Sequence, residues 1–129
     1  MNKQVTKGKP QHELEEKVGT AVQQFLSQQI GENITFVNTQ IIDQMVVVRL
    51  KGGLCAAEKM LSRNHEGKKL LTELKSRLMT EVKTVLEQIV RNTAEIEITG
   101  SYASYDPDRE EHIILFACDD TAKMPPENM

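Results

Sequence analysis

The sequence contains no tryptophan, and aromatic residues make up only 4% of its 129 residues. A chain so poor in aromatic rings lacks the platform on which unpaired bases stack, and a net charge of −3 gives no general attraction for phosphate backbones. We therefore expect no nucleic-acid partner. The same shortage means that valine, isoleucine and leucine must fill most of the core.

Cysteines and long apolar runs are also scarce. Cys55 and Cys118 are too few for a disulfide framework and too far apart for a CxxC site, so we expect buried free thiols. No apolar run approaches the roughly 20 residues of a membrane-spanning helix, and the first residues lack the apolar stretch of a secretory signal. These absences predict a cytoplasmic protein that does not itself insert into a membrane.

No pattern typical of an active site or a metal centre occurs. His12, His65 and His112 are not at metal-ligand spacing from one another, and no GxSxG elbow marks a nucleophile. The acidic stretch near residue 110 lacks the spacing of a calcium loop and is typical of a solvated hairpin tip. The sequence therefore predicts no catalytic residue, no metal and no cofactor.

The length suits a single domain. We expect an ordered domain over residues 13–120. Residues 1–12 lack apolar periodicity and residues 121–129 contain Pro125 and Pro126, so both ends are predicted to be mobile tails.

Helical periodicity marks two regions. Residues 13–30 carry apolar side chains at spacings of three and four, and Gly31 predicts the end of that helix. A second region follows Gly52 and Gly53, with a short helix over 56–63, a break at 64–67 and then a long helix. The predicted buried face of the long helix comprises Leu71, Leu74, Leu78, Val82, Val85 and Ile89.

Two strand pairs complete the pattern. The segments ITFVNTQII and MVVVRL flank a reversal at Asp43, and AEIEIT and HIILFAC flank a turn over 105–109 in which Asp side chains can bond nearby backbone N–H groups. MVVVRL and HIILFAC are nearly continuous apolar runs, which is typical of central strands, whereas the other two carry polar positions typical of edges.

These patterns together predict the α+β class. We expect a two-layer αββαββ sandwich with a four-stranded mixed sheet in the order 1-2-4-3, in which strands 2 and 4 form a parallel central pair. This is a circularly permuted ferredoxin-like arrangement with both helices on one face of the sheet.

Such an arrangement leaves the other sheet face uncovered. Alternate residues of the central strands would point to it, and we expect Met45, Val47, Ile114 and Phe116 there. An apolar open face indicates a partner. A homodimer is the simplest interpretation, and a different protein partner is the alternative.

The segment from Arg49 to Lys69 is basic, with six cationic side chains against two carboxylates in an otherwise acidic chain. Glycines allow close backbone approach, and a following helix N-terminus offers free N–H groups. We therefore predict a site for an anion or an acidic partner surface, and the alternative is a simple turn with solvated cations. The predicted site residues are Arg49, Lys51, Gly52, Gly53, Lys59 and Arg63.

The stretch VVVRLKGGLCAAEKMLSRNHEGKKLLTELKSRLMTEVKTVLEQI, with the Asp-Pro-Asp hairpin and HIILFACD, resembles the MpsC family, named for a sodium-translocating, membrane-potential-generating system. The resemblance covers roughly residues 13–119, and its most specific part is Val47–Lys59. Members typically have Thr at the position of Cys55 and often Pro at that of Ala56, so that Thr and the residue at Glu58 form a capping box.

The resemblance implies a soluble companion of membrane subunits that move ions or take up inorganic carbon, with no catalytic residues to carry over. Our first hypothesis is a non-enzymatic accessory domain that binds itself and a membrane-associated partner. The second is a regulatory or sensor domain that binds a small anion at the basic glycine loop.

Overall fold

The computed structural model describes residues 2–118, and the side chains from residue 11 on. The elements are α1 (Asn2–Gln24), the π-helix η1 (Phe25–Ile30), β1 (Ile34–Ile42), β2 (Met45–Gly52), α2 (Ala56–Leu61), α3 (His65–Glu81), α4 (Lys83–Ala94), β3 (Ile98–Asp106) and β4 (Glu111–Cys118). The tail predicted at 121–129 lies outside the described residues.

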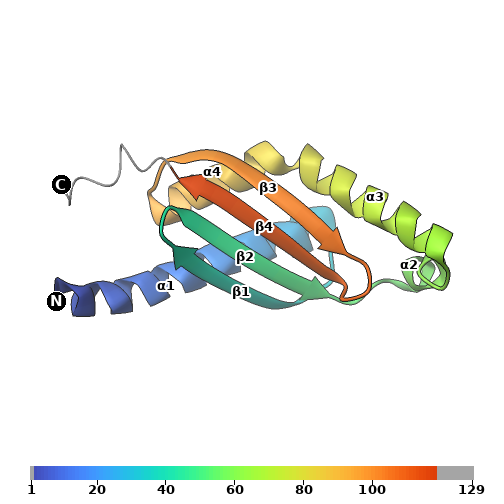
Figure 1. The fold of residues 1–129 in the computed structure, drawn as a ribbon, viewed down its shortest axis with the longest axis horizontal. Helices are drawn as coiled ribbons and strands as arrows, with labels where there is room; N and C mark the ends of the chain where they lie inside the picture. Colours follow the sequence, from blue (N-terminus) through green and yellow to red (C-terminus); the bar gives the residue numbers. More distant parts are fainter. Residues whose placement is uncertain (1, 119–129) are drawn as a thin grey trace.

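The strands form one sheet in the order β1-β2-β4-β3, as predicted. Figure 1 shows the sheet in front and the helices behind it, so the two-layer α+β sandwich with one open sheet face is confirmed. The order is that of the permuted ferredoxin-like plan.

The predicted direction of the central pair is wrong. β2 and β4 pair antiparallel, with Val46 opposite Phe116 and Val48 opposite Ile114. The helices between the hairpins form a crossover, so β3 runs in the direction of β2, and the β3–β4 hairpin then reverses β4. Every neighbouring pair is therefore antiparallel, and the sheet is not mixed.

The core lies between the sheet and the helices and is aliphatic. Phe116 is its largest fully buried side chain, and it packs with residues from α1, β2 and α4. The fully buried members from those elements and from η1 are Val18, Val22, Leu26, Val46, Val48, Leu50 and Val90. Burying each such side chain stabilises the fold by about 1.5–3 kcal/mol.

Ile114 and Phe116 do not lie on the open face. Their exposed fractions are 2% and 0%, because both point into the helix-covered core. HIILFAC is apolar at nearly every position, so its composition does not reveal which alternate residues face inward. Ile113 and Leu115 occupy the open face instead, opposite Arg49 and Val47 of β2.

The helix boundaries differ from the predictions at several points. α1 begins at Asn2 and so includes most of the segment predicted as a tail, whose mobility stays a prediction. Gly31 ends η1 as expected, with φ of 90° and its N–H donated to the Leu26 carbonyl. The predicted break at 64–67 is shorter, because Asn64 caps α3 and accepts a hydrogen bond from the Gly67 N–H at 2.8 Å.

The long helix is divided in two at Val82, whose φ of −101° and ψ of 8° depart from helical values. Leu71 and Val82 are buried as predicted, but Leu74 and Val85 are 52% and 45% exposed. The buried face of α3 instead continues from Leu71 through Lys75 and Met79, and α4 buries Leu86, Val90 and Ala94.

The third strand begins later than predicted. α4 continues to Ala94 and ends at Glu95 in the left-handed conformation, with φ of 57°. β3 therefore starts at Ile98 and includes Gly100 and Ala103, two small residues that lack a strong strand propensity. The following turn forms as expected, since the Asp106 carboxylate accepts a hydrogen bond from the Asp108 N–H at 3.0 Å.

Gly67 allows α2 to approach α3, and its replacement tests this contact. A Cβ at Gly67 would overlap the carbonyl oxygen of Leu61, the last residue of α2. We expect Gly67→Ala to lower the free energy of unfolding by about 1–3 kcal/mol in urea denaturation. Gly100→Ala is the matched control, because nothing lies within 4 Å of its Cβ position. Equal stability of the two variants would contradict the close contact.

Candidate functional site

A buried ionic network joins three elements and the loop after η1 at the end of the sheet near α2. Lys75 of α3 donates to Glu32, which follows η1, at 2.9 Å, and lies 3.2 Å from the carboxylate of Glu58 in α2. Glu32 also contacts Nε2 of His112 in β4 at 3.1 Å. The Lys75 and His112 side chains are only 6% and 3% exposed. Residues distant in the sequence are thus held together by charge.

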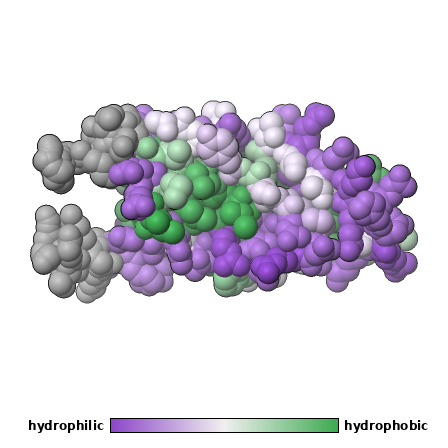
Figure 2. All heavy atoms as spheres, in the orientation of Figure 1, coloured by the Kyte–Doolittle hydropathy of each residue, from purple (hydrophilic) through white to green (hydrophobic). Residues whose placement is uncertain are grey.

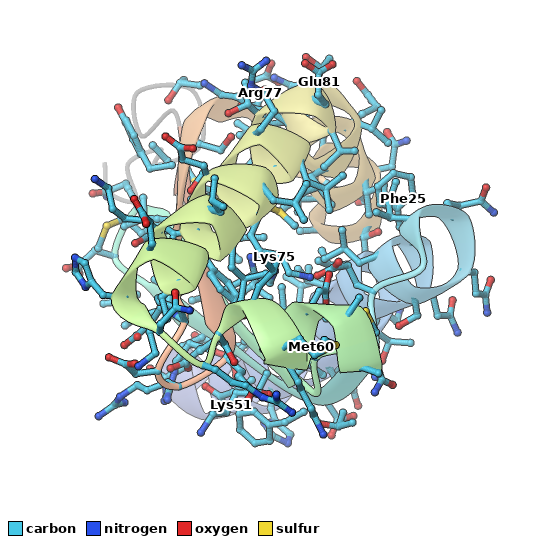
Figure 3. All side chains as sticks on the ribbon, turned by 90° about the vertical axis from the view of Figure 1, so that its right-hand side faces the viewer. Phe25, Lys51, Met60, Lys75, Arg77 and Glu81 are labelled. Atoms are coloured by element: carbon cyan, nitrogen blue, oxygen red, sulfur yellow. The ribbon has the colours of Figure 1, made fainter. Side chains whose placement is uncertain are left out.

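Local structure explains why these side chains meet. Gly31 stops η1 and turns the chain toward β1, which brings Glu32 to the edge of the core. The Asn64 cap fixes the start of α3, so that Lys75 falls on the buried stripe between Leu71 and Met79. Figure 3 shows Lys75 pointing inward between α3 and α2, while Arg77 points outward.

The network shifts the pKa values of its members. Burial alone would raise the pKa of Glu32, but hydrogen bonds from His112 and Lys75 outweigh it and hold the value at about 2. Burial alone would lower the pKa of Lys75, yet its bonds to Glu32 and Glu58 raise it above the ordinary value. Both groups are therefore charged at neutral pH, and each stabilises the other's charge.

Tyr105 of β3 closes the network on one side. Its ring lies 4.7 Å from the His112 ring, and its burial raises the pKa of the phenol. The Tyr105 hydroxyl and His112 Nδ1 are buried and have no hydrogen-bond partner in the described part of the chain. Both residues line a cavity of about 10 Å³ that Gly52 and Gly53 help to enclose. A cavity of this size has room for about one water molecule, which both polar atoms could bind.

A second, open cleft lies on the other side of the glycine loop. It has a volume of about 610 Å³ and includes four of the six residues predicted for an anion site. Its lining comprises Thr35, Phe36, Arg49, Lys51, Gly52, Gly53, Arg109 and Glu110. The structure therefore brings Arg49, Lys51 and the two glycines together, and adds Arg109 and Phe36.

Lys59 and Arg63 do not line this cleft. They are exposed, on α2 and just after it. The start of α2 is not free for an anion, because the Glu58 carboxylate accepts a hydrogen bond from the Cys55 N–H at 3.1 Å. The acidic half of the capping box thus persists with Cys55 at the N-cap. Cys55 is exposed rather than buried, which corrects the prediction for that thiol.

Arg49 is held in place by a buried carboxylate. Its Nε donates to Glu111 at 2.7 Å, and the Glu111 side chain is only 2% exposed. Arg109 lies 3.9 Å from the other oxygen of Glu111. The Glu111 carboxylate therefore fixes the guanidinium of Arg49 by a short hydrogen bond and makes only a longer contact with that of Arg109, at the mouth of the cleft.

The open sheet face carries an apolar patch, which Figure 2 shows as a hydrophobic area over the strands. Met45 and Val47 lie there as predicted, and Ile113 and Leu115 replace Ile114 and Phe116. Ile42 and Tyr102, on the two outer strands, are 44% and 69% exposed. We call the face formed by Ile42, Met45, Val47, Tyr102, Ile113 and Leu115 the open-face patch.

The described residues contain no group of three or more His, Cys, Asp or Glu side chains arranged to hold a metal ion. Over the same part of the chain, no helix combines the length and apolar character needed to cross a membrane.

The fold and these sites define a two-layer α+β domain with an apolar open face and a basic cleft at one end of it. The chain matches the family described as MpsC, Na+-translocating membrane potential-generating system, over residues 10–120. It therefore belongs to the MpsC family. Comparison with curated proteins and with solved structures gave no match.

The lowered pKa of Glu32 predicts a loss of stability in acid. Ionised Glu32 stabilises the fold above pH 4.5, its ordinary pKa, and this contribution disappears as the pH falls from 4.5 toward 2. We expect a loss of roughly 2–3 kcal/mol over that range in urea denaturation. Glu32→Gln should flatten this pH dependence, whereas Glu13→Gln, which changes an exposed carboxylate on α1, should retain it. An unchanged pH profile in Glu32→Gln would contradict the assignment.

Proposed function

We propose that this protein is a non-enzymatic accessory domain that pairs with a second copy of itself through the open-face patch. In this proposal the dimer acts in the cytoplasm as a component of a membrane ion-translocating system, held at the membrane by a protein partner. The open-face patch is the observation that carries the proposal. The family description, which names a membrane-potential-generating system, supports the wider setting.

The patch has the composition of a sheet-packing surface. Val47 pairs with Leu115 and Met45 with Ala117, so the two central strands present apolar side chains side by side. Two sheets that pack face to face bury such rows against each other at about 10 Å separation. Exposed apolar patches of this kind mark interaction sites in other proteins.

The charges favour a second copy as the occupant. The patch itself contains no ionisable group apart from the Tyr102 hydroxyl, and Arg49 at its margin is neutralised by Glu111. A two-fold contact places the same surface on both subunits, so any unpaired charge would face its own kind. A neutral, apolar surface avoids that repulsion even though each chain carries a net charge of −3.

Val47→Glu tests the interface directly. We expect the wild-type chain to sediment as a dimer at micromolar concentration, and Val47→Glu to sediment as a monomer because a buried, unpaired carboxylate is costly. Thr84→Glu is the matched control, since it adds the same charge to an exposed position of α4 on the helix layer. Melting temperatures verify that each variant folds. A wild-type monomer at all concentrations would contradict the proposal.

The setting at the membrane needs a separate experiment. Affinity capture of the tagged wild-type chain from detergent-solubilised native membranes should recover subunits with ion-translocating activity. We expect the monomeric variant to recover less of them, because two linked binding sites act at a higher effective concentration than one. Recovery of no membrane protein by the wild-type chain would contradict this part of the proposal.

A further inference from the structure

The cleft beside the glycine loop is built from three separate parts of the sheet. β1 contributes Thr35 and Phe36, β2 contributes Arg49 and Lys51, and the β3–β4 turn contributes Arg109. Its volume of about 610 Å³ lies within the range of small-molecule sites.

The cationic groups at the cleft retain free donors. Arg49 uses Nε to reach Glu111, and neither of its terminal nitrogens makes a hydrogen bond to any described residue. Lys51 takes part in no ion pair within residues 11–118, and the contacts of Arg109 with Asp106 and Glu111 are both 3.9 Å long. Glu111 thus positions the guanidinium of Arg49 while leaving its two outer nitrogens available for another anion.

The charge balance limits the charge of that anion. Glu111 pairs with Arg49, and Asp106 and Glu111 each lie 3.9 Å from Arg109, whereas Lys51 has no carboxylate partner among the described residues. One unpaired cation beside a guanidinium with free donors suits a monoanion. A polyphosphate would meet two carboxylates without enough cations to offset them.

Phe36 and the two glycines form the uncharged part of the cleft surface. The Phe36 side chain is 45% exposed although it lies on an ordered strand, and it forms an apolar wall of the cleft. A Cβ at Gly52 would overlap the carbonyl oxygen of Asn33, so the Gly52 backbone packs directly against the backbone of Asn33. An aromatic wall beside bare backbone accommodates a flat apolar group.

We propose that this cleft binds a small organic monocarboxylate with a flat apolar body. The ligand carboxylate accepts hydrogen bonds from the outer nitrogens of Arg49, since the planar guanidinium can bond both carboxylate oxygens at once. Lys51 and Arg109 add long-range electrostatic attraction. The apolar body lies against Phe36 and the backbone of Gly52 and Gly53. All residues of the site come from one chain.

The ligand class can be tested by titrating the isotopically labelled protein with benzoate and following backbone amide shifts. Benzamide is the neutral probe of the same shape, and bicarbonate and phosphate are anions without an apolar body. We expect saturable shifts at Gly52 and Gly53 with benzoate only. Equal binding of benzamide, stronger binding of bicarbonate or phosphate, or no saturation with benzoate at tens of millimolar would overturn the proposal.

Paired variants locate the site while sparing the buried carboxylate. The double variant Lys51→Gln/Arg109→Gln should weaken benzoate binding about tenfold, and Phe36→Ser should weaken it as well. Lys59→Gln/Arg63→Gln removes the same charge from α2, outside the cleft, and should change the affinity less than about twofold. Because all five positions are at least partly exposed, each variant is expected to fold. Equal effects of the two double variants would assign binding to net charge alone and overturn the proposed site.

Discussion

The contact of Lys75 with two carboxylates is the constraint on which the end of the molecule near α2 depends. α2 contributes no buried residue, so the hydrophobic effect alone does not hold it against α3. Glu58 holds it instead, since one carboxylate both caps the helix and pairs with Lys75. Glu32 completes the network and links it to His112 in the sheet. An unpaired Lys75 would be strongly destabilising at this depth, which makes the arrangement specific as well as stable.

The network also bears on the two surfaces to which we assign function. The loop containing Gly52 and Gly53 passes between the small cavity beside His112 and the open basic cleft, and it lines both. Its position follows from the elements on either side, β2 and α2. Glu58 holds α2 on one side of this loop, and the Gly52 backbone packs close to Asn33 on the other. The open-face patch depends on the sheet alone, so the two surfaces can be altered separately.

Much of the fold could be predicted because each hairpin and helix carries a local pattern. Strand order followed from the apolar runs of β2 and β4, whereas their relative direction depends on the crossover, which no local pattern reveals. The sheet face to which Ile114 points was not predictable, because its segment is apolar at almost every position. The ionic network was missed because Lys75 interrupts an apolar stripe and its partners Glu32 and Glu58 are distant in the chain. Arg109 lies at the cleft only because β4 pairs with β2. Arg49 and the two glycines could be identified from their local sequence pattern.

A double-mutant cycle on Glu32 and Lys75 tests the central claim most directly. The free energy of unfolding is measured in urea for Glu32→Gln, Lys75→Met and the double variant at neutral pH. We expect each single variant to lose about 3–5 kcal/mol, since each leaves a buried charge without one of its partners. The free energy of unfolding of the double variant should fall by no more than that of either single variant. The difference from additivity would then be a coupling energy of several kcal/mol. Additive losses would show that the two residues act independently and would contradict the account.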